Sequence, residues 1–177
     1  MIRRTKDRAV SVDYATAADV SAAIATAVAA LPPFPTTFVA SRKGSTTTRQ
    51  STTTYADDPA MAVSVNAGVN YTIRGVIRFQ TTVAAGFRWQ MTGPAVTSLQ
   101  IDSTYQLPGT SAVSVNAIDT AFSTSRVLVV AATTPGWIRF EINVVPSGSG
   151  TIHLQWAQGV SDASDTSVLL GSYVEVL

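Results

Sequence analysis

The single histidine, His153, is the first residue to consider as a catalytic base. It lies within Thr151-Ile-His-Leu-Gln-Trp156, where strand alternation places it on one face with Thr151 and Gln155. No acid lies near it in the sequence. Because a general base needs a positioned nucleophile and an orienting acid, we expect a surface or interface histidine and no enzymatic activity.

Two acidic pairs have oxygens to offer a calcium ion, Asp57-Asp58 and Asp162-Ala-Ser-Asp165. Neither pair follows the calcium-loop pattern. Both pairs lie among turn residues, so we expect their carboxylates to accept hydrogen bonds from nearby backbone amides. The chain has no cysteine, which excludes disulfides and cysteine-ligated metals. We expect no cofactor and no metal. A hydrolase, as the remaining enzymatic alternative, would need its carboxylate pair from the two glutamates, Glu141 and Glu175.

Three tryptophans, Trp89, Trp137 and Trp156, have flat faces suited to sugar rings. All three fall within regular strand patterns, which favours core packing for at least two of them. Glycan contact is the alternative role.

Arginines on the predicted strands form a candidate basic patch. Arg74 and Arg78 project from the same face of one strand, and we expect Arg88 to join them across a hairpin. Such a patch suits an anionic partner. The alternatives are that these arginines keep an outer face soluble or pair with acids of a neighbouring subunit.

Alternating apolar and polar residues predict strands along most of the chain. The clearest segment is 71–80, with Tyr71, Ile73, Ile77 and Phe79 on one face. A turn at Ala85-Gly86 predicts a hairpin to the next strand, and residues 45–54 are expected to form an exposed strand or an extended crossing. The other predicted strands, separated by Gly- and Pro-containing turns, are 36–42, 87–91, 113–117, 126–132, 137–145, 151–158 and 167–176. This pattern predicts a mainly β fold, an antiparallel jelly-roll-like β-sandwich preceded by one N-terminal oligomerising α-helix.

The helix is predicted over residues 16–31. It opens with Thr16-Ala-Ala-Asp19, an Asp version of the capping box, and closes before Pro32-Pro33. Its apolar residues recur at spacings of four, four and three, a narrow stripe typical of a seam between identical helices, at Val20, Ile24, Val28 and Leu31. The alternative is a helix that lies on its own β domain.

The first residues form a basic arm. Arg3, Arg4, Lys6 and Arg8 against Asp7 leave a local charge of +3, which suits docking on an acidic surface, although an ordinary solvated terminus has the same composition. The expected organisation is a basic arm over 1–15, the helix over 16–31, a Pro-rich connector over 32–36 and a β head over 37–177.

Composition limits the class of protein. Only 13% of the residues are charged while 46% are hydrophobic, which favours burial in an assembly. The net charge of +1 recruits neither nucleic acid nor an anionic membrane. No apolar run approaches the roughly 20 residues of a membrane span, and the start lacks a signal-peptide core. We expect a protein made in a cytoplasm and not exported by a signal of its own.

Several short motifs are similar to a domain of small structural proteins of tailed bacteriophages, especially those of actinobacteria. The resemblance covers roughly residues 36–177. The segments that carry it are 53–61 (TTYADDPAM), 65–77 (VNAGVNYTIRGVI), 86–89 (GFRW), 93–95 (GPA), 150–158 (GTIHLQWAQ), 161–164 (SDAS) and 168–173 (VLLGSY).

The resemblance implies a trimeric virion component with a β-sandwich head. We therefore expect a capsid decoration or head-fibre protein, made in the host bacterial cytoplasm, that forms a homotrimer and binds the major capsid protein through its N-terminal region. The alternative is a tail or baseplate component whose head binds a host-surface glycan. Neither role involves nucleic acid or a membrane.

Overall fold

The computed structural model describes residues 16–29, 40–110, 112–115, 118–130 and 132–177. The chain divides into an N-terminal unit, residues 1–37, and a C-terminal unit, residues 38–177, here called the head. The expected arm with Arg3, Arg4, Lys6 and Arg8, the connector 32–36 and Leu31 lie outside the described residues.

The N-terminal unit contains helix α1 (Ala17–Ala29), and the last two residues of the predicted range, 30 and 31, lie outside the described residues. The capping box is confirmed: the Asp19 amide donates to Thr16 Oγ1 at 3.2 Å, and the Thr16 amide donates to Asp19 Oδ2 at 2.8 Å. The Thr16 hydroxyl also donates to Asp19 Oδ2, at 2.6 Å. These bonds hold the pKa of Asp19 below its usual value, because they stabilise the carboxylate form.

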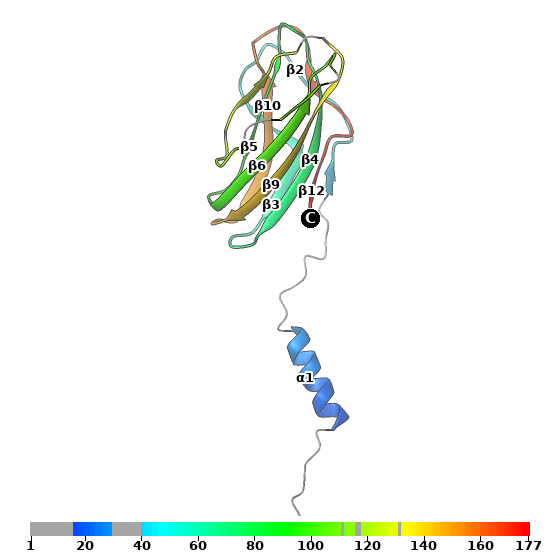
Figure 1. Cartoon of the computed structure of the whole chain (residues 1–177), viewed down its shortest axis with the longest axis vertical. Coiled ribbons are helices and arrows are strands. Elements are labelled where there is room, and N and C mark those ends of the chain that lie inside the picture. Colours follow the sequence, from blue (N-terminus) through cyan, green and yellow to red (C-terminus); the bar gives the residue numbers. More distant parts are fainter. Residues whose placement is uncertain (1–15, 30–39, 111, 116–117, 131) are drawn as a thin grey trace, which may run out of the picture. The chain divides into compact units, whose positions relative to one another are not determined.

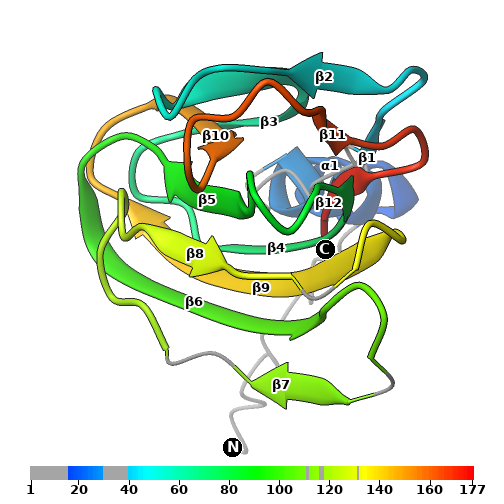
Figure 2. The same cartoon turned by 90° about the horizontal axis from the view of Figure 1, so that it is seen from above.

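The head is a sandwich of two antiparallel sheets (Figures 1 and 2). The eight-stranded sheet contains, in order, β1 (Ala40–Arg42), β12 (Tyr173–Val176), β4 (Tyr71–Gln80), β9 (Gly136–Pro146), β6 (Val96–Gln106) and β7 (Val113–Val115), with β11 (Thr166–Val168) beside β4 and β2 (Thr47–Arg49) beside β11. The four-stranded sheet contains β3 (Ala56–Val65), β10 (Gly150–Gln158), β5 (Phe87–Thr92) and β8 (Arg126–Leu128).

The connectivity confirms the jelly roll. From β3 to β10 the chain changes sheet at every connection except that between β6 and β7. The order β3-β10-β5-β8 therefore faces the order β4-β9-β6-β7, which is the eight-strand jelly-roll arrangement. The remaining four strands extend the larger sheet beyond β4.

The core lies between the sheets and is built from inward-facing side chains of both. Phe79 of β4 stacks on Phe87 of β5 with ring centroids 4.6 Å apart, and Phe87 lies 6.0 Å from Trp156 of β10. The alternation predicted for β4 is confirmed, since Ile73, Ile77 and Phe79 are fully buried. Large rings that interlock across the sandwich exclude water from its centre.

Several local predictions were wrong. The loop around Ala85 and Gly86 does not close a hairpin, because β4 pairs with β9 and lies in the other sheet from β5. The acidic pair Asp57-Asp58, expected among turn residues, lies inside β3, next to a register shift against β10. The range 167–176 is divided into β11 and β12 by a turn at Gly171, whose positive φ of 84° favours glycine. Strand β6 was not predicted at all.

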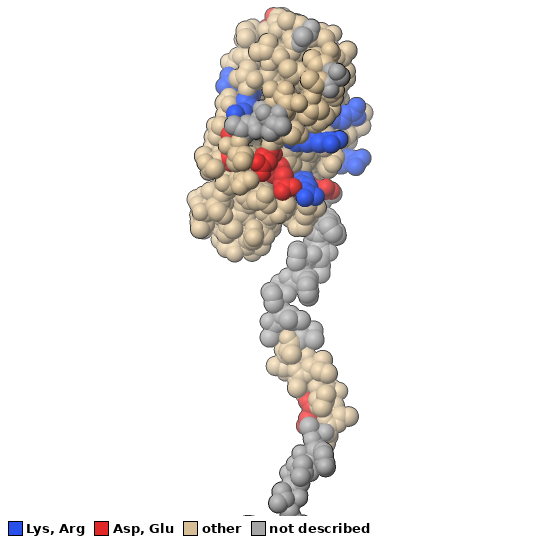
Figure 3. All heavy atoms as spheres, viewed as in Figure 1, with Lys and Arg blue, Asp and Glu red and all other residues tan. Residues whose placement is uncertain are grey.

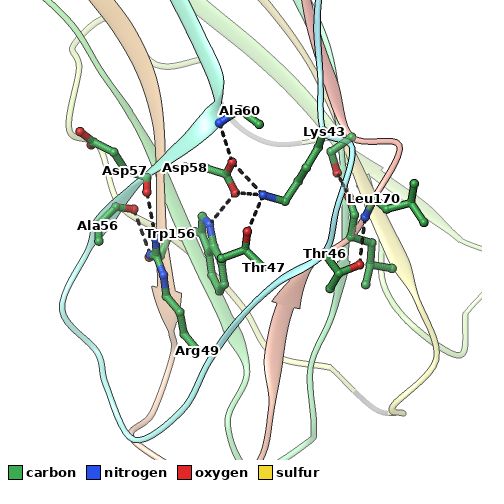
Figure 4. A network of polar contacts seen from close by, with 12 residues as sticks. Lys43, Thr46, Thr47, Arg49, Ala56, Asp57, Asp58, Ala60, Trp156 and Leu170 are labelled. Atoms are coloured by element: carbon green, nitrogen blue, oxygen red, sulfur yellow. Dashed lines mark hydrogen bonds and ion pairs between the residues drawn. The ribbon is translucent and has the colours of Figure 1, made fainter.

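A buried ion pair ties the first strands to the sandwich (Figure 4). Lys43 is 3% exposed and Asp58 is fully buried. The ammonium donates to Asp58 Oδ1 and Oδ2 at 2.9 and 2.8 Å and to Thr47 Oγ1 at 2.7 Å. Asp58 also accepts from the Trp156 indole at 3.2 Å and from the Ala60 amide at 3.1 Å. Each of the three ammonium protons therefore has an acceptor.

Arg49 supports the same corner from the other side of the tryptophan (Figure 4). Its guanidinium carbon lies 4.0 Å from the Trp156 ring centroid. It donates to the carbonyls of Ala56 at 2.9 Å and Asp57 at 3.0 Å, and to that of Trp156. Burial lowers the pKa of Arg49, and the carboxylates of Asp58 and Asp57 act in the opposite direction. Segment 40–55 is thus fastened to β3 and β10.

Replacement of Lys43 by Met should strongly destabilise the head. The variant leaves the Asp58 carboxylate buried without its counter-ion, which typically costs about 3–5 kcal/mol. The measurement is urea unfolding followed by tryptophan fluorescence at matched protein concentration. Arg74→Met, which breaks an exposed ion pair, is the control and should cost at most about 1 kcal/mol. Equal losses in the two variants would contradict a structural role for the buried pair.

Candidate functional site

The outward-facing side chains of the eight-stranded sheet, here called the wide face, carry most of the charge on the head's sheets. Cross-strand register places Glu175, Arg74, Glu141 and Asp102 in one row across β12, β4, β9 and β6. Figure 3 shows acidic side chains gathered beside basic ones on the side of the head where Figure 1 labels β4, β6 and β9. This acidic row is the first feature of the site.

Hydrogen bonds hold the centre of the acidic row. Arg74 Nε donates to Glu141 Oε2 at 2.7 Å, and the Asn143 amide donates to Glu141 Oε1 at 3.3 Å. Both bonds favour the ionised form, with that from Arg74 the larger cause, and so lower the pKa of Glu141. Asp102 accepts from the Gln100 amide at 2.8 Å.

The next row along the strands is basic. Arg42, Tyr173, Val76 and Arg139 lie side by side across β1, β12, β4 and β9. The Arg139 guanidinium carbon lies 4.7 Å from the ring centroid of Trp137, and that of Arg42 lies 5.8 Å from the ring of Tyr173. At these distances the cations stack on the aromatic faces.

A hollow of about 430 Å³ lies between the two rows. Arg74, Glu141, Arg139 and Asp102 line it, and Ile118, which is 58% exposed, stands at its rim. The hollow thus combines two cations, two carboxylates and an apolar wall.

The predicted arginine patch is partly wrong. Arg74 and Arg78 do share the wide face, but Arg88 lies on β5 in the other sheet. Its guanidinium carbon is 4.4 Å from the ring of Tyr55. Arg42 and Arg139 take its place on the wide face. The sequence carries no signal for this grouping, because it depends on which strands pair.

Two of the three tryptophans are buried in the core and one lies partly exposed on the wide face. Trp89 and Trp156 are 1% and 0% exposed, so glycan contact is wrong for both, and core packing of at least two tryptophans is confirmed. Trp137 is partly exposed on the wide face, with its indole N–H donating to Gln106 Oε1 at 2.6 Å. Of the three, Trp137 alone is partly exposed, and Arg139 stacks on its ring.

His153 is partly exposed, and the fold gives it an acidic neighbour that the sequence did not reveal. Its Nδ1 lies 4.0 Å from Asp57 Oδ2 of β3. Asp57 also accepts from the Gln155 amide at 2.7 Å.

Asp58 and Asp162, from the two acidic pairs, bond nearby groups of the protein. Asp58 lies within β3 and pairs with Lys43, and it also accepts from the nearby Ala60 amide at 3.1 Å, as expected. Asp162 Oδ1 accepts from the Ser164 amide at 2.8 Å, as expected. A bond from the Ser164 side chain and, as the smaller cause, this bond from its amide lower the pKa of Asp162. Within the described part of the chain, no group of three His, Asp or Glu side chains is placed to hold a metal ion. Glu141 and Glu175 lie on the open wide face on either side of Arg74.

Helix α1 exposes two of the four residues predicted for its seam, those whose side chains the structure describes. Val20 and Ile24 are 49% and 59% exposed. No helix in the described residues is long and apolar enough to cross a membrane.

Comparison with known proteins identifies no family. No family model matches the chain, and no curated protein matches it either. Solved structures of infectious bursal disease virus align with it: the Gx strain at 16% identity and a TM-score of 0.19, the VP2 subviral particle at 16% and 0.22, and the Gt strain at 12% and 0.20.

These alignments cover 83%, 80% and 84% of this chain and 44%, 40% and 44% of the matched chains. The chain therefore spans less than half the length of the proteins that it matches. At these TM-scores the likeness carries no inference about function.

Replacement of Arg74 by Gln should raise the pKa of Glu141 towards the ordinary glutamate value, because the main donor to its carboxylate is lost. Carboxylate ¹³C NMR titration measures this directly. Arg78→Gln, which removes the same charge four residues further along β4, is the matched control and should shift the Glu141 titration much less. A Glu141 titration unchanged in Arg74→Gln would contradict the described pair.

Proposed function

We propose that the protein is a bacteriophage virion structural protein, most specifically a trimeric capsid decoration or head-fibre protein. The observation that carries the proposal is the capped helix α1, whose apolar stripe is exposed at Val20 and Ile24. The motifs similar to phage structural proteins in residues 36–177 support the same role for the head.

The helix needs a partner to be stable. Isolated helices shorter than about 12–15 residues are marginal in water, and α1 has 13 residues. Burial of Val20 and Ile24 in a seam contributes about 1.5–3 kcal/mol for each side chain. Val28, one further step of four along the chain, continues the stripe. Association of three copies would bury these apolar side chains between the helices, and the heads would add further contacts.

The head supplies the outward-facing part. Its sandwich has a continuous core from both sheets, so it does not need the helix to complete its interior. In this proposal the basic arm docks on an acidic surface of the major capsid protein. The bound trimer then reinforces contacts between capsomers and presents the head on the particle.

Replacement of Ile24 by Asp should dissociate the trimer, because three carboxylates would meet in an apolar seam. Multi-angle light scattering of the full chain measures the mass. Ala22→Asp places the same charge on the opposite side of the helix and serves as the control, which should remain trimeric. An unchanged mass for Ile24→Asp, or a monomeric wild type, would overturn the seam.

Deletion of residues 1–8 should abolish co-sedimentation with purified empty capsids that lack the protein, while the urea unfolding midpoint of the head stays unchanged. A variant with Gln at Arg3, Arg4, Lys6 and Arg8 keeps the length of the arm and should also fail to bind if charge drives docking. Undiminished binding of the deletion variant would overturn docking through the arm. A wild-type protein that ignores capsids but binds tails or host cell walls would favour the tail or baseplate alternative.

A further inference from the structure

The cations of the head fall into two groups. Most of them hydrogen-bond a protein group in the described structure: Lys43, Arg74 and Arg126 bond carboxylates, and Arg49 and Arg88 bond backbone carbonyls. In the part of the head that the structure describes, the side chains of three cations make no such bond: Arg42, Arg78 and Arg139. These three form the second group.

All three belong to one strip of the wide face, although they come from β1, β4 and β9. Arg42 and Arg139 lie in a single row with Tyr173 and Val76 between them, three strand spacings apart or about 14 Å. Arg78 lies in the next row, opposite Trp137. Two rows of a strand are about 7 Å apart, so this arginine strip is long and narrow.

Aromatic rings orient two of the three guanidinium groups. Arg139 stacks on Trp137 and Arg42 on Tyr173. A guanidinium that lies on a ring loses little further freedom when it binds an anion, and its planar N–H groups remain available for two oxygens of one phosphate. The rings also give apolar surface to the uncharged atoms between charges of a ligand.

We propose that the arginine strip binds a linear polymer of phosphate groups. The polymer runs across β9, β4, β12 and β1, with its phosphates on Arg139, Arg78 and Arg42. This binding activity is separate from docking through the N-terminal arm and does not rest on the proposed virion role.

The position of the acidic row favours a thin chain as the ligand over a broad acidic protein surface. Glu175, Glu141 and Asp102 lie one row, about 7 Å, from the Arg42–Arg139 row. A flat anionic surface that covered the strip would also meet these carboxylates and be repelled. A single chain can follow the strip and avoid them.

The test is titration of the full-length protein with inorganic polyphosphate of defined length, by calorimetry at several salt concentrations. Three contacts predict that the logarithm of the affinity falls with the logarithm of salt concentration with a slope of about −2. The double variant Arg78→Gln/Arg139→Gln should bind at least about tenfold more weakly at low salt, with a slope near −0.7. The three arginines are exposed, so an unchanged unfolding midpoint verifies that this variant is folded.

The matched control is Arg88→Gln/Arg126→Gln, which removes the same charge from the smaller sheet, on β5 and β8. It should retain most of the affinity. Equal weakening in both double variants would show attraction to net charge and overturn the strip. No binding of polyphosphate at low salt would overturn the proposal, and equally tight binding of polygalacturonate would overturn its restriction to phosphate.

Discussion

The buried ion pair between Lys43 and Asp58 is the interaction on which the rest of the head depends. Removing two charges from water is costly, and a buried pair is tolerated only when its geometry is good and its remaining hydrogen-bonding capacity is used. Here the ammonium has three acceptors, and the carboxylate also receives the Trp156 indole and a backbone amide. The pair therefore fixes the tryptophan that stacks on Phe87 in the core. It joins segment 40–55 to β3 at the edge of the smaller sheet.

The attachment of segment 40–55 by this ion pair also determines which side chains lie on the surface of the larger sheet. Lys43 directly follows β1, and its amide and carbonyl bond Ser172 and Gly171 just before β12. Strands β1 and β12 extend the larger sheet past β4, which would otherwise leave its backbone groups at an open edge. The extension adds Arg42, Tyr173 and Glu175 to the wide face. One buried contact thus helps to place the cations and acids that a ligand would meet.

Much of the fold was predictable, because it depends on local patterns. The alternation of Ile73, Ile77 and Phe79 marks β4, and Thr16 with Asp19 marks the start of α1. Strand β6 escaped prediction because its inward positions include Ser103, and Leu99 and Ile101 are its only buried apolar side chains. Pairing with β9 along its length holds it in place. The hairpin at Ala85-Gly86 was wrong because a turn reverses the chain but does not decide whether the next strand pairs with the last or crosses to the other sheet.

The sequence by itself determined the capped helix with its apolar stripe, the mainly β character of the remainder, and a scarcity of charge that makes each charged residue informative. Only the tertiary structure decided which of those residues meet. Lys43 pairs with Asp58, which lies 15 residues away in the sequence, and Arg74 pairs with Glu141, which lies 67 residues away. Arg42, Arg78 and Arg139 come from three different strands and lie on one face. The physical reason is that helix caps and strand alternation arise from neighbours in the chain. Strand register, by contrast, arises from the packing of the whole sandwich, so residues with no local relation become partners.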